Sequence, residues 1–266
     1  MKRGLLSIPS RARRAFSLVE LMVVIGVIAV LVGIVLVVGG TLAENTNITR
    51  TRNFMQVLDG ALTEWQNRAD RSLTWGMDGL PFAQSRYDMQ ADAPHVYLIT
   101  QMLDVVGRSG DVKSILSQID ERHLIQYNNA QATAPPWLRN VSANEPDPAS
   151  NQWVTQWQSG AYNGRLTVLD AWDRPIRVVH PGRLWDAKPP WNDTIASSGP
   201  PDEDGTVRTV YENIYGVCRN RRPLFVSAGP DGEFGNLQLN LLPGNRNAAL
   251  SALADDNIYS YEVEGR

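Results

Sequence analysis

The 266 residues include 25 lysines and arginines and 28 aspartates and glutamates, and 43% of the residues are hydrophobic. This balance is typical of a globular protein and excludes collagen-like and wholly disordered chains. A single cysteine excludes a disulfide framework within the monomer and a cysteine-based zinc site. Residues 1–15 contain five basic side chains and no acid, which leaves 20 basic and 28 acidic side chains for the rest of the chain and argues against nucleic-acid binding.

Residues 21–40 contain no charged side chain. A helix of this length spans ~30 Å, the hydrocarbon thickness of a bilayer. Because basic residues precede the segment and acidic residues follow it, the positive-inside rule places Met1 in the cytoplasm. A cleaved signal peptide is a weaker interpretation, since the apolar stretch is too long. A plain signal anchor does not explain Glu20, a carboxylate at the membrane edge.

Residues 13–21, which read RRAFSLVEL, resemble the processing motif of type IV pilins and type II secretion pseudopilins. The resemblance implies that residues 1–15 are a leader removed between Ala15 and Phe16, and that Phe16 is then N-methylated. Glu20 matches the glutamate that pairs with the N-terminal amine of a neighbouring subunit during assembly, a partner that a buried carboxylate requires. The family usually has glycine before the cut, where this chain has Ala15.

The helical pattern continues beyond the apolar segment. Apolar residues recur at i, i+3 and i+4 spacing on one helix face: Phe54, Val57, Leu58, Ala61, Leu62 and Trp65. No proline interrupts the chain between Pro9 and Pro81. We therefore predict one helix over 16–72, with a transmembrane segment at 21–40 and a second half that packs on a globular head, 73–266.

Within the head, apolar periodicity predicts two inserted helices, 94–106 and 112–122, with Asp111 as the N-cap of the second. A small helix around 247–253 is also predicted. Short strand patterns at 166–170, 176–180, 224–227 and 258–263 are separated by turn residues and indicate antiparallel pairing. A long helix on a small antiparallel sheet is an α+β, pilin-like fold.

Two segments of the head resemble the major type II secretion pseudopilin. Residues 170–176 (DAWDRPI) resemble its D-x-W-G-x-P hairpin, with Asp173 in place of the usual glycine, and residues 225–232 (FVSAGPDG) resemble its S-x-G-x-D-G stretch. The resemblance implies a calcium site in the last loop, with Asp231, Asp255 and Asp256 as ligands, since calcium prefers oxygen donors. Alternatively, Asp231 only occupies a turn and Asp255 caps a strand.

The resemblance implies a pseudopilin that assembles with other pseudopilins into a type II secretion-like filament for protein export. Its implied partners are a prepilin peptidase, an inner-membrane assembly platform and an ATPase, and its implied location is a single inner-membrane pass with the head in the periplasm. A minor pilin of a type IV pilus is the alternative within the family. We expect no enzymatic activity; a membrane-anchored periplasmic hydrolase is the alternative. Arg219, Arg221 and Arg222 beside Cys218 predict a lowered pKa for its thiol, although no sequence pattern brings a histidine to it.

Overall fold

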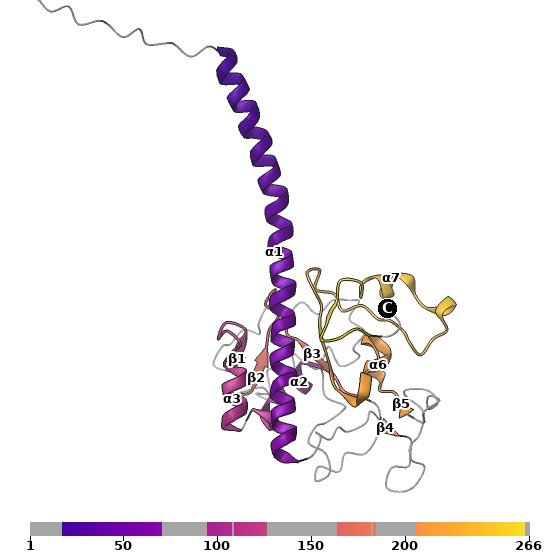
Figure 1. The fold of residues 1–266 in the computed structure, drawn as a ribbon. Helices are drawn as coiled ribbons and strands as arrows, with labels where there is room; N and C mark the ends of the chain where they lie inside the picture. The colour runs from indigo at the N-terminus through magenta and orange to yellow at the C-terminus, as the bar shows by residue number, and fades with distance from the viewer. Residues whose placement is uncertain are drawn as a thin grey trace, which may run out of the picture. The chain divides into compact units, whose positions relative to one another are not determined.

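The computed structural model describes residues 18–70, 95–107, 109–126, 164–181, 183–184 and 206–263. The chain divides into two compact units, residues 1–45 and 46–266, and the helix α1 (Leu18–Ala69) contributes to both (Figure 1). The combination of an N-terminal helix with small antiparallel sheets is compatible with the predicted α+β fold.

The second half of α1 packs one face into the hydrophobic core of the head. The buried side chains on this face are Phe54, Met55, Leu58, Ala61 and Leu62. Arg50 and Arg52 are exposed. The division into an apolar and a charged face follows the 3.6-residue period that the sequence predicts.

The two inserted helices are α2 (His95–Val106) and α3 (Gly110–Leu116). The predicted bounds of the second helix were wrong at both ends. Ser109, not Asp111, is the N-cap, because its backbone is already extended at φ −73° and ψ 136°. The helix ends at Leu116, and the chain turns so that the Ile119 N–H donates to the Leu116 carbonyl and the buried Ile119 still joins the core.

The strands form three small antiparallel sheets. Their members are β1 (Leu124–Gln126) with β2 (Leu166–Val168), β3 (Arg177–Val179) with β6 (Leu224–Ser227) and β7 (Ile258–Tyr259), and β4 (Arg183–Leu184) with β5 (Thr206–Val207). In the three-stranded sheet β6 is central, with Val178 opposite Phe225 and Val226 opposite Tyr259. α2 packs against β2 and β3.

Three of the four predicted strands are shorter than expected, whereas 224–227 was predicted correctly. The segments 166–170 and 176–180 approach each other at an isolated bridge between Leu169 and Pro175, where the Ile176 N–H donates to the Val168 carbonyl and the Asp170 N–H donates to the Arg174 carbonyl. The last strand ends at Tyr259, since the Ser260 Oγ takes the next hydrogen bond from β6 by accepting from the Phe225 N–H.

Short helices connect the later strands. They are α6 (Val210–Tyr215), the 3₁₀ helices η1 (Arg219–Arg221) and η2 (Pro243–Asn245), and α7 (Ala248–Ala252). The predicted small helix around 247–253 is confirmed by α7, which Asn247 caps by accepting hydrogen bonds from the Ala249 and Leu250 N–H groups. Helix α6 was not predicted.

Candidate functional site

The predicted processing residues Ala15 and Phe16 lie outside the described residues. Glu20 lies in the first turn of α1 and is exposed. A carboxylate in this position is favourable because the N-terminus of a helix carries a partial positive charge.

Around Glu20, the start of α1 exposes large apolar side chains on all sides. They are 47–74% exposed and include Leu18, Val19, Leu21, Met22, Val23, Val24, Ile25, Val27, Ile28, Val30, Leu31, Val32 and Ile34. A continuous exposed apolar surface of this kind marks a site that binds another protein or a membrane.

In the described part of the chain, we find no helix that is both long enough and apolar enough to cross a membrane. The predicted transmembrane segment, 21–40, includes residues 35–39, whose side chains lie outside the described part.

The hairpin that begins at Asp170 joins α1 to the C-terminal part of the head. The Ala171 N–H donates to Oγ1 of the buried Thr51 on α1, over 3.1 Å. Asp170 is fully buried and accepts three hydrogen bonds, from the Trp172 and Arg174 N–H groups at 2.9 Å each and from the Ser227 Oγ at 2.6 Å. Two segments separated by about fifty residues of sequence, 170–176 and 225–232, are thus bonded directly to each other.

Asp173 stands where the pseudopilin motif has glycine. Its φ is +61°, a left-handed conformation that glycine adopts freely and that aspartate tolerates better than most residues. The substitution therefore fits the turn that the backbone makes here. Its carboxylate forms an exposed ion pair with Arg122 at 2.9 Å.

Two glycines allow the segment 225–232 to turn tightly against its neighbours. Gly229 has φ +67°, and a Cβ there would overlap the backbone carbonyl of Asp256. Gly232 has φ +81°, and a Cβ there would overlap the guanidinium of Arg174. The turn is therefore closed on one side by the hairpin and on the other by the residues that precede β7.

This turn brings together two of the three predicted calcium ligands. The Asp231 N–H donates to Asp256 Oδ2 at 3.2 Å, and Asp231 Oδ1 accepts from the Glu233 N–H at 2.7 Å. Burial, opposed by the hydrogen bond from Asp231 and reinforced by its negative charge, raises the pKa of Asp256. Asp255 is exposed, and its N–H closes the turn after α7 by donating to the Ala252 carbonyl. Among the described residues, no three acidic, histidine or cysteine side chains are grouped closely enough to hold a metal ion.

Comparison with known protein families identifies the motif in the N-terminal segment. Residues 10–36 match the model of the prokaryotic N-terminal methylation motif, and the match includes Ala15, Phe16 and Glu20. The chain carries the signature of type IV pilins and pseudopilins. This pilin motif implies processing by a prepilin peptidase and assembly with other pilin-like subunits. No curated protein and no solved structure matches the chain.

Two buried titratable groups of the head, His180 and Cys218, are shifted toward their neutral forms. Burial lowers the pKa of His180 to about 4. Burial, followed by the negative charge of Glu212, raises the pKa of the Cys218 thiol well above its ordinary value of 9.0. The neighbouring arginines in the sequence suggested the opposite shift, but the Arg222 guanidinium pairs with Asp59 on α1.

Sequence reasoning missed two features that position these segments. The sequence did not indicate that Thr51 links α1 to the hairpin, because a single threonine on a helix has no distinctive pattern. Helix α6 had a readable signal, since Thr209 and Glu212 form a capping box in which each side chain accepts from the other residue's N–H.

Proposed function

We propose that the protein is a pseudopilin subunit that assembles into a type II secretion-like filament and acts mechanically, without catalysing a reaction. The observation that carries the proposal is the methylation motif at 10–36, with Glu20 as the fifth residue counted from Phe16. The exposed apolar surface of Leu18–Ile34 supports it, because subunits can bury this surface against one another in a filament core.

In this proposal, Glu20 selects and orients the incoming subunit. Cleavage before Phe16 creates an α-ammonium group, and an anion and a cation that leave water together must pair. The carboxylate of Glu20 in one subunit would bind the Phe16 amine of its neighbour, which fixes the axial offset between two apolar helices.

The head must move as one piece with the second half of α1 for such assembly to transmit force. Leu58 and Met55 are fully buried in the core of the head. Two ion pairs add links from α1, one between Asp59 and Arg222 and one between Arg68 and Asp111 at 2.5 Å. Three of the four charged side chains are exposed and Asp59 is half-buried, so the apolar contacts supply most of the stabilisation.

We favour secretion over a type IV pilus because of the C-terminal part of the head. The two segments that resemble the major pseudopilin are bonded through Asp170 and Ser227, which supports their acting as one unit. The partners in this proposal are other pseudopilins, a prepilin peptidase, an inner-membrane platform and an ATPase. The head would lie in the periplasm on a single inner-membrane pass.

We also propose that calcium binds at the Asp231 and Asp256 carboxylates. The residues fit a cation, because the turn brings the two carboxylates together and the Asp231 N–H donates to Asp256 Oδ2 at 3.2 Å. Calcium takes about six to eight oxygen ligands, so backbone carbonyls and water would complete the shell around these two carboxylates. When bound, the ion would neutralise this pair and hold the turn closed. Thermal melting with and without a chelator tests this: wild type should lose stability on chelation and Asp231→Ala should not, whereas no shift in wild type would refute it.

The test of the proposed function is processing followed by assembly. Terminal sequencing of membrane-derived protein should begin at Phe16, and a start at Met1 or Glu44 would refute the pilin interpretation. Glu20→Ala should leave processing and membrane insertion intact and reduce filament yield at least tenfold. Glu44→Ala, an exposed glutamate on the same helix, is the matched control and should assemble normally.

A further inference from the structure

The stretch 234–254, which precedes β7, differs in charge from the rest of the head. Arg246 is its only charged side chain, and the acidic residues nearest to it along the chain are Glu233 and Asp255, which bound the stretch. The chain beyond residue 15 has 28 acidic against 20 basic side chains. An anionic surface therefore repels the head as a whole but attracts this stretch.

Two adjacent leucines in this stretch are exposed to solvent. The exposed fraction is 40% for Leu241 and 74% for Leu242. In the part of the chain that the structure describes, every other exposed large apolar side chain belongs to α1. Leu237 is by contrast buried, and its N–H donates to the Ile214 carbonyl at 2.9 Å, which fixes the stretch to α6. The fold therefore presents the two leucines to an apolar partner rather than to its own core.

The turn that carries these leucines, residues 240–246, satisfies much of its own backbone; we call it the leucine turn. The N–H and the carbonyl of Leu241 both have partners, and the carbonyl accepts from Arg246 Nε at 3.2 Å. The Leu242 carbonyl accepts from the Asn245 N–H at 2.8 Å. Because a backbone polar group without a partner is costly in lipid, these bonds lower the cost of burying the turn in a membrane.

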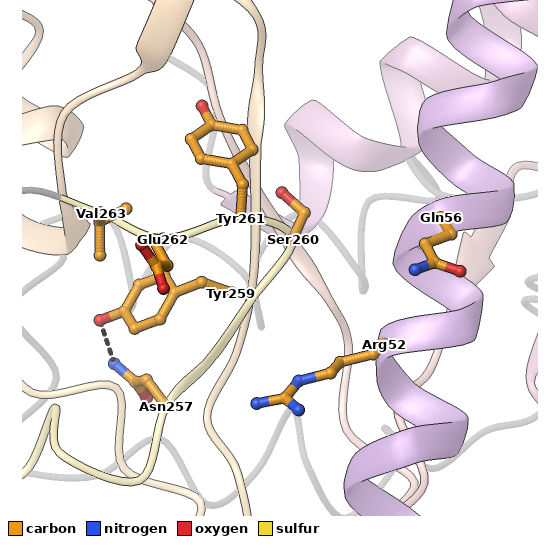
Figure 2. A pocket seen from close by; sticks show the side chains of 8 residues that line it. All are labelled: Arg52, Gln56, Asn257, Tyr259, Ser260, Tyr261, Glu262 and Val263. Atoms are coloured by element: carbon orange, nitrogen blue, oxygen red, sulfur yellow. Dashed lines mark hydrogen bonds between the residues drawn. The ribbon is translucent and has the colours of Figure 1, made fainter.

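The leucine turn lies at the end of the unit 46–266 where α1 enters. Figure 1 shows α7, which follows the turn, at that end of the unit and β4 and β5 at the opposite end. Arg52 of α1 lies across a groove of about 480 Å³ from Asn257 (Figure 2), and the Asn257 amide donates to the Phe234 carbonyl at 2.6 Å. The base of the stretch is thus fixed beside an early turn of α1 in this unit.

This end of the unit is close to lipid in the proposed function, on which the inference rests. Six residues separate Gly40, the last residue of the predicted membrane pass, from Thr46, the first residue of the unit. A helix of that length rises ~9 Å, and the headgroup layer on each side of a bilayer is roughly 5–8 Å deep. A binding surface at the end where α1 enters can therefore reach the headgroups.

We propose that the leucine turn docks on the anionic surface of the membrane that holds α1. Leu241 and Leu242 insert among the acyl chains next to the headgroups, and Arg246 binds lipid phosphate. The leucines gain by leaving water, and a basic side chain in an acid-free stretch gains from the negative surface potential. Docking would hold the head against the membrane until assembly withdraws α1.

The test is photo-crosslinking of the full-length chain in vesicles of phosphatidylglycerol and phosphatidylethanolamine. A photoreactive residue in place of Leu242 should attach to phospholipid, and the same residue in place of Lys113, which is exposed on α3, should not. Arg246→Glu should reduce the phospholipid adduct at position 242 about tenfold. Arg246→Lys, which keeps the charge, should retain most of it. Lys113→Glu is the matched control and should leave this adduct unchanged.

A photoreactive residue at Ile25, which is exposed on α1, separates failure of this inference from failure of the proposed function. If Ile25 attaches to phospholipid and position 242 does not, the docking inference is wrong and the membrane anchor stands. The inference is also wrong if Arg246→Lys loses as much adduct as Arg246→Glu, or if position 242 joins only a second copy. If Ile25 does not attach to phospholipid, the single-pass anchor of the proposed function is refuted, and the docking inference with it.

Discussion

Replacement of Asp170 by alanine should uncouple the hairpin from the segment 225–232. The carboxylate is fully buried and is the acceptor for two backbone N–H groups and for the hydroxyl of Ser227. Alanine removes the acceptor and leaves these three donors without it. Each buried donor that loses its partner costs about 1–3 kcal/mol.

Adding the full cost of all three donors would overestimate the loss of stability, because water and side-chain relaxation compensate part of it. The lower end of this range for each of the three donors gives about 3 kcal/mol, which is the loss that we expect for Asp170→Ala. For a head of this size, that corresponds to a thermal midpoint lower by roughly 10 °C. Asp170→Asn keeps one acceptor oxygen for the two N–H groups and should cost about 1–2 kcal/mol.

Urea unfolding of wild type, Asp170→Ala and Asp170→Asn measures these differences in the free energy of unfolding. Asp173→Asn is the matched control in the same turn, since its ion pair with Arg122 is exposed and should contribute less than about 1 kcal/mol. Equal stability of Asp170→Ala and Asp173→Asn would refute the reasoning, because the hairpin would then not depend on the buried carboxylate.

The buried carboxyl group of Asp170 should also make the stability of the protein depend on pH. Burial, opposed by the hydrogen bond from Ser227 and the two backbone N–H groups, raises the pKa of Asp170 above its ordinary value of 3.8. The folded chain therefore binds this proton more tightly than the unfolded chain. This group's contribution to stability should then fall as pH rises from 3.8 through the raised pKa, and Asp170→Asn should lack that slope.

Three further predictions concern the rest of the head. Thr209→Ala should lower the free energy of unfolding by about 0.5–2 kcal/mol because it breaks the capping box of α6, whereas Ser109→Ala, at an N-cap without a side-chain hydrogen bond, should change it little in the same urea titration. Leu58→Ala should cost about 2–5 kcal/mol by leaving a cavity in the core, and the partly buried Val57→Ala should cost less; equal losses would argue against the packing of this face. Cys218 should react slowly with iodoacetamide at pH 8 in the folded protein and rapidly in urea, because burial raises the pKa of its thiol, and fast native labelling would contradict this.

The sequence by itself determined the features that depend on local order along the chain. The five-residue spacing from Phe16 to Glu20 and the basic leader are linear patterns, and the methylation-motif match agrees with them. The apolar face of α1 followed from periodicity alone, because burial of a helix against a core requires one residue every three or four positions. The small helix at α7 was readable from its length and composition.

Only the tertiary structure decided how segments distant in sequence meet. The link between Asp170 and Ser227, the hold of Thr51 on the hairpin and the approach of Asp231 to Asp256 join residues 25 to 120 positions apart. No local pattern encodes such pairs, since each depends on how the sheets and α1 pack. The shift of the Cys218 pKa shows the same limit: adjacent arginines in the sequence predicted a lower value, and the fold placed the thiol beside Glu212 and away from water. The pKa of a group depends on the charges and the solvent around it in space. For a buried group, the packing of the fold determines these neighbours, and the order of residues along the chain does not.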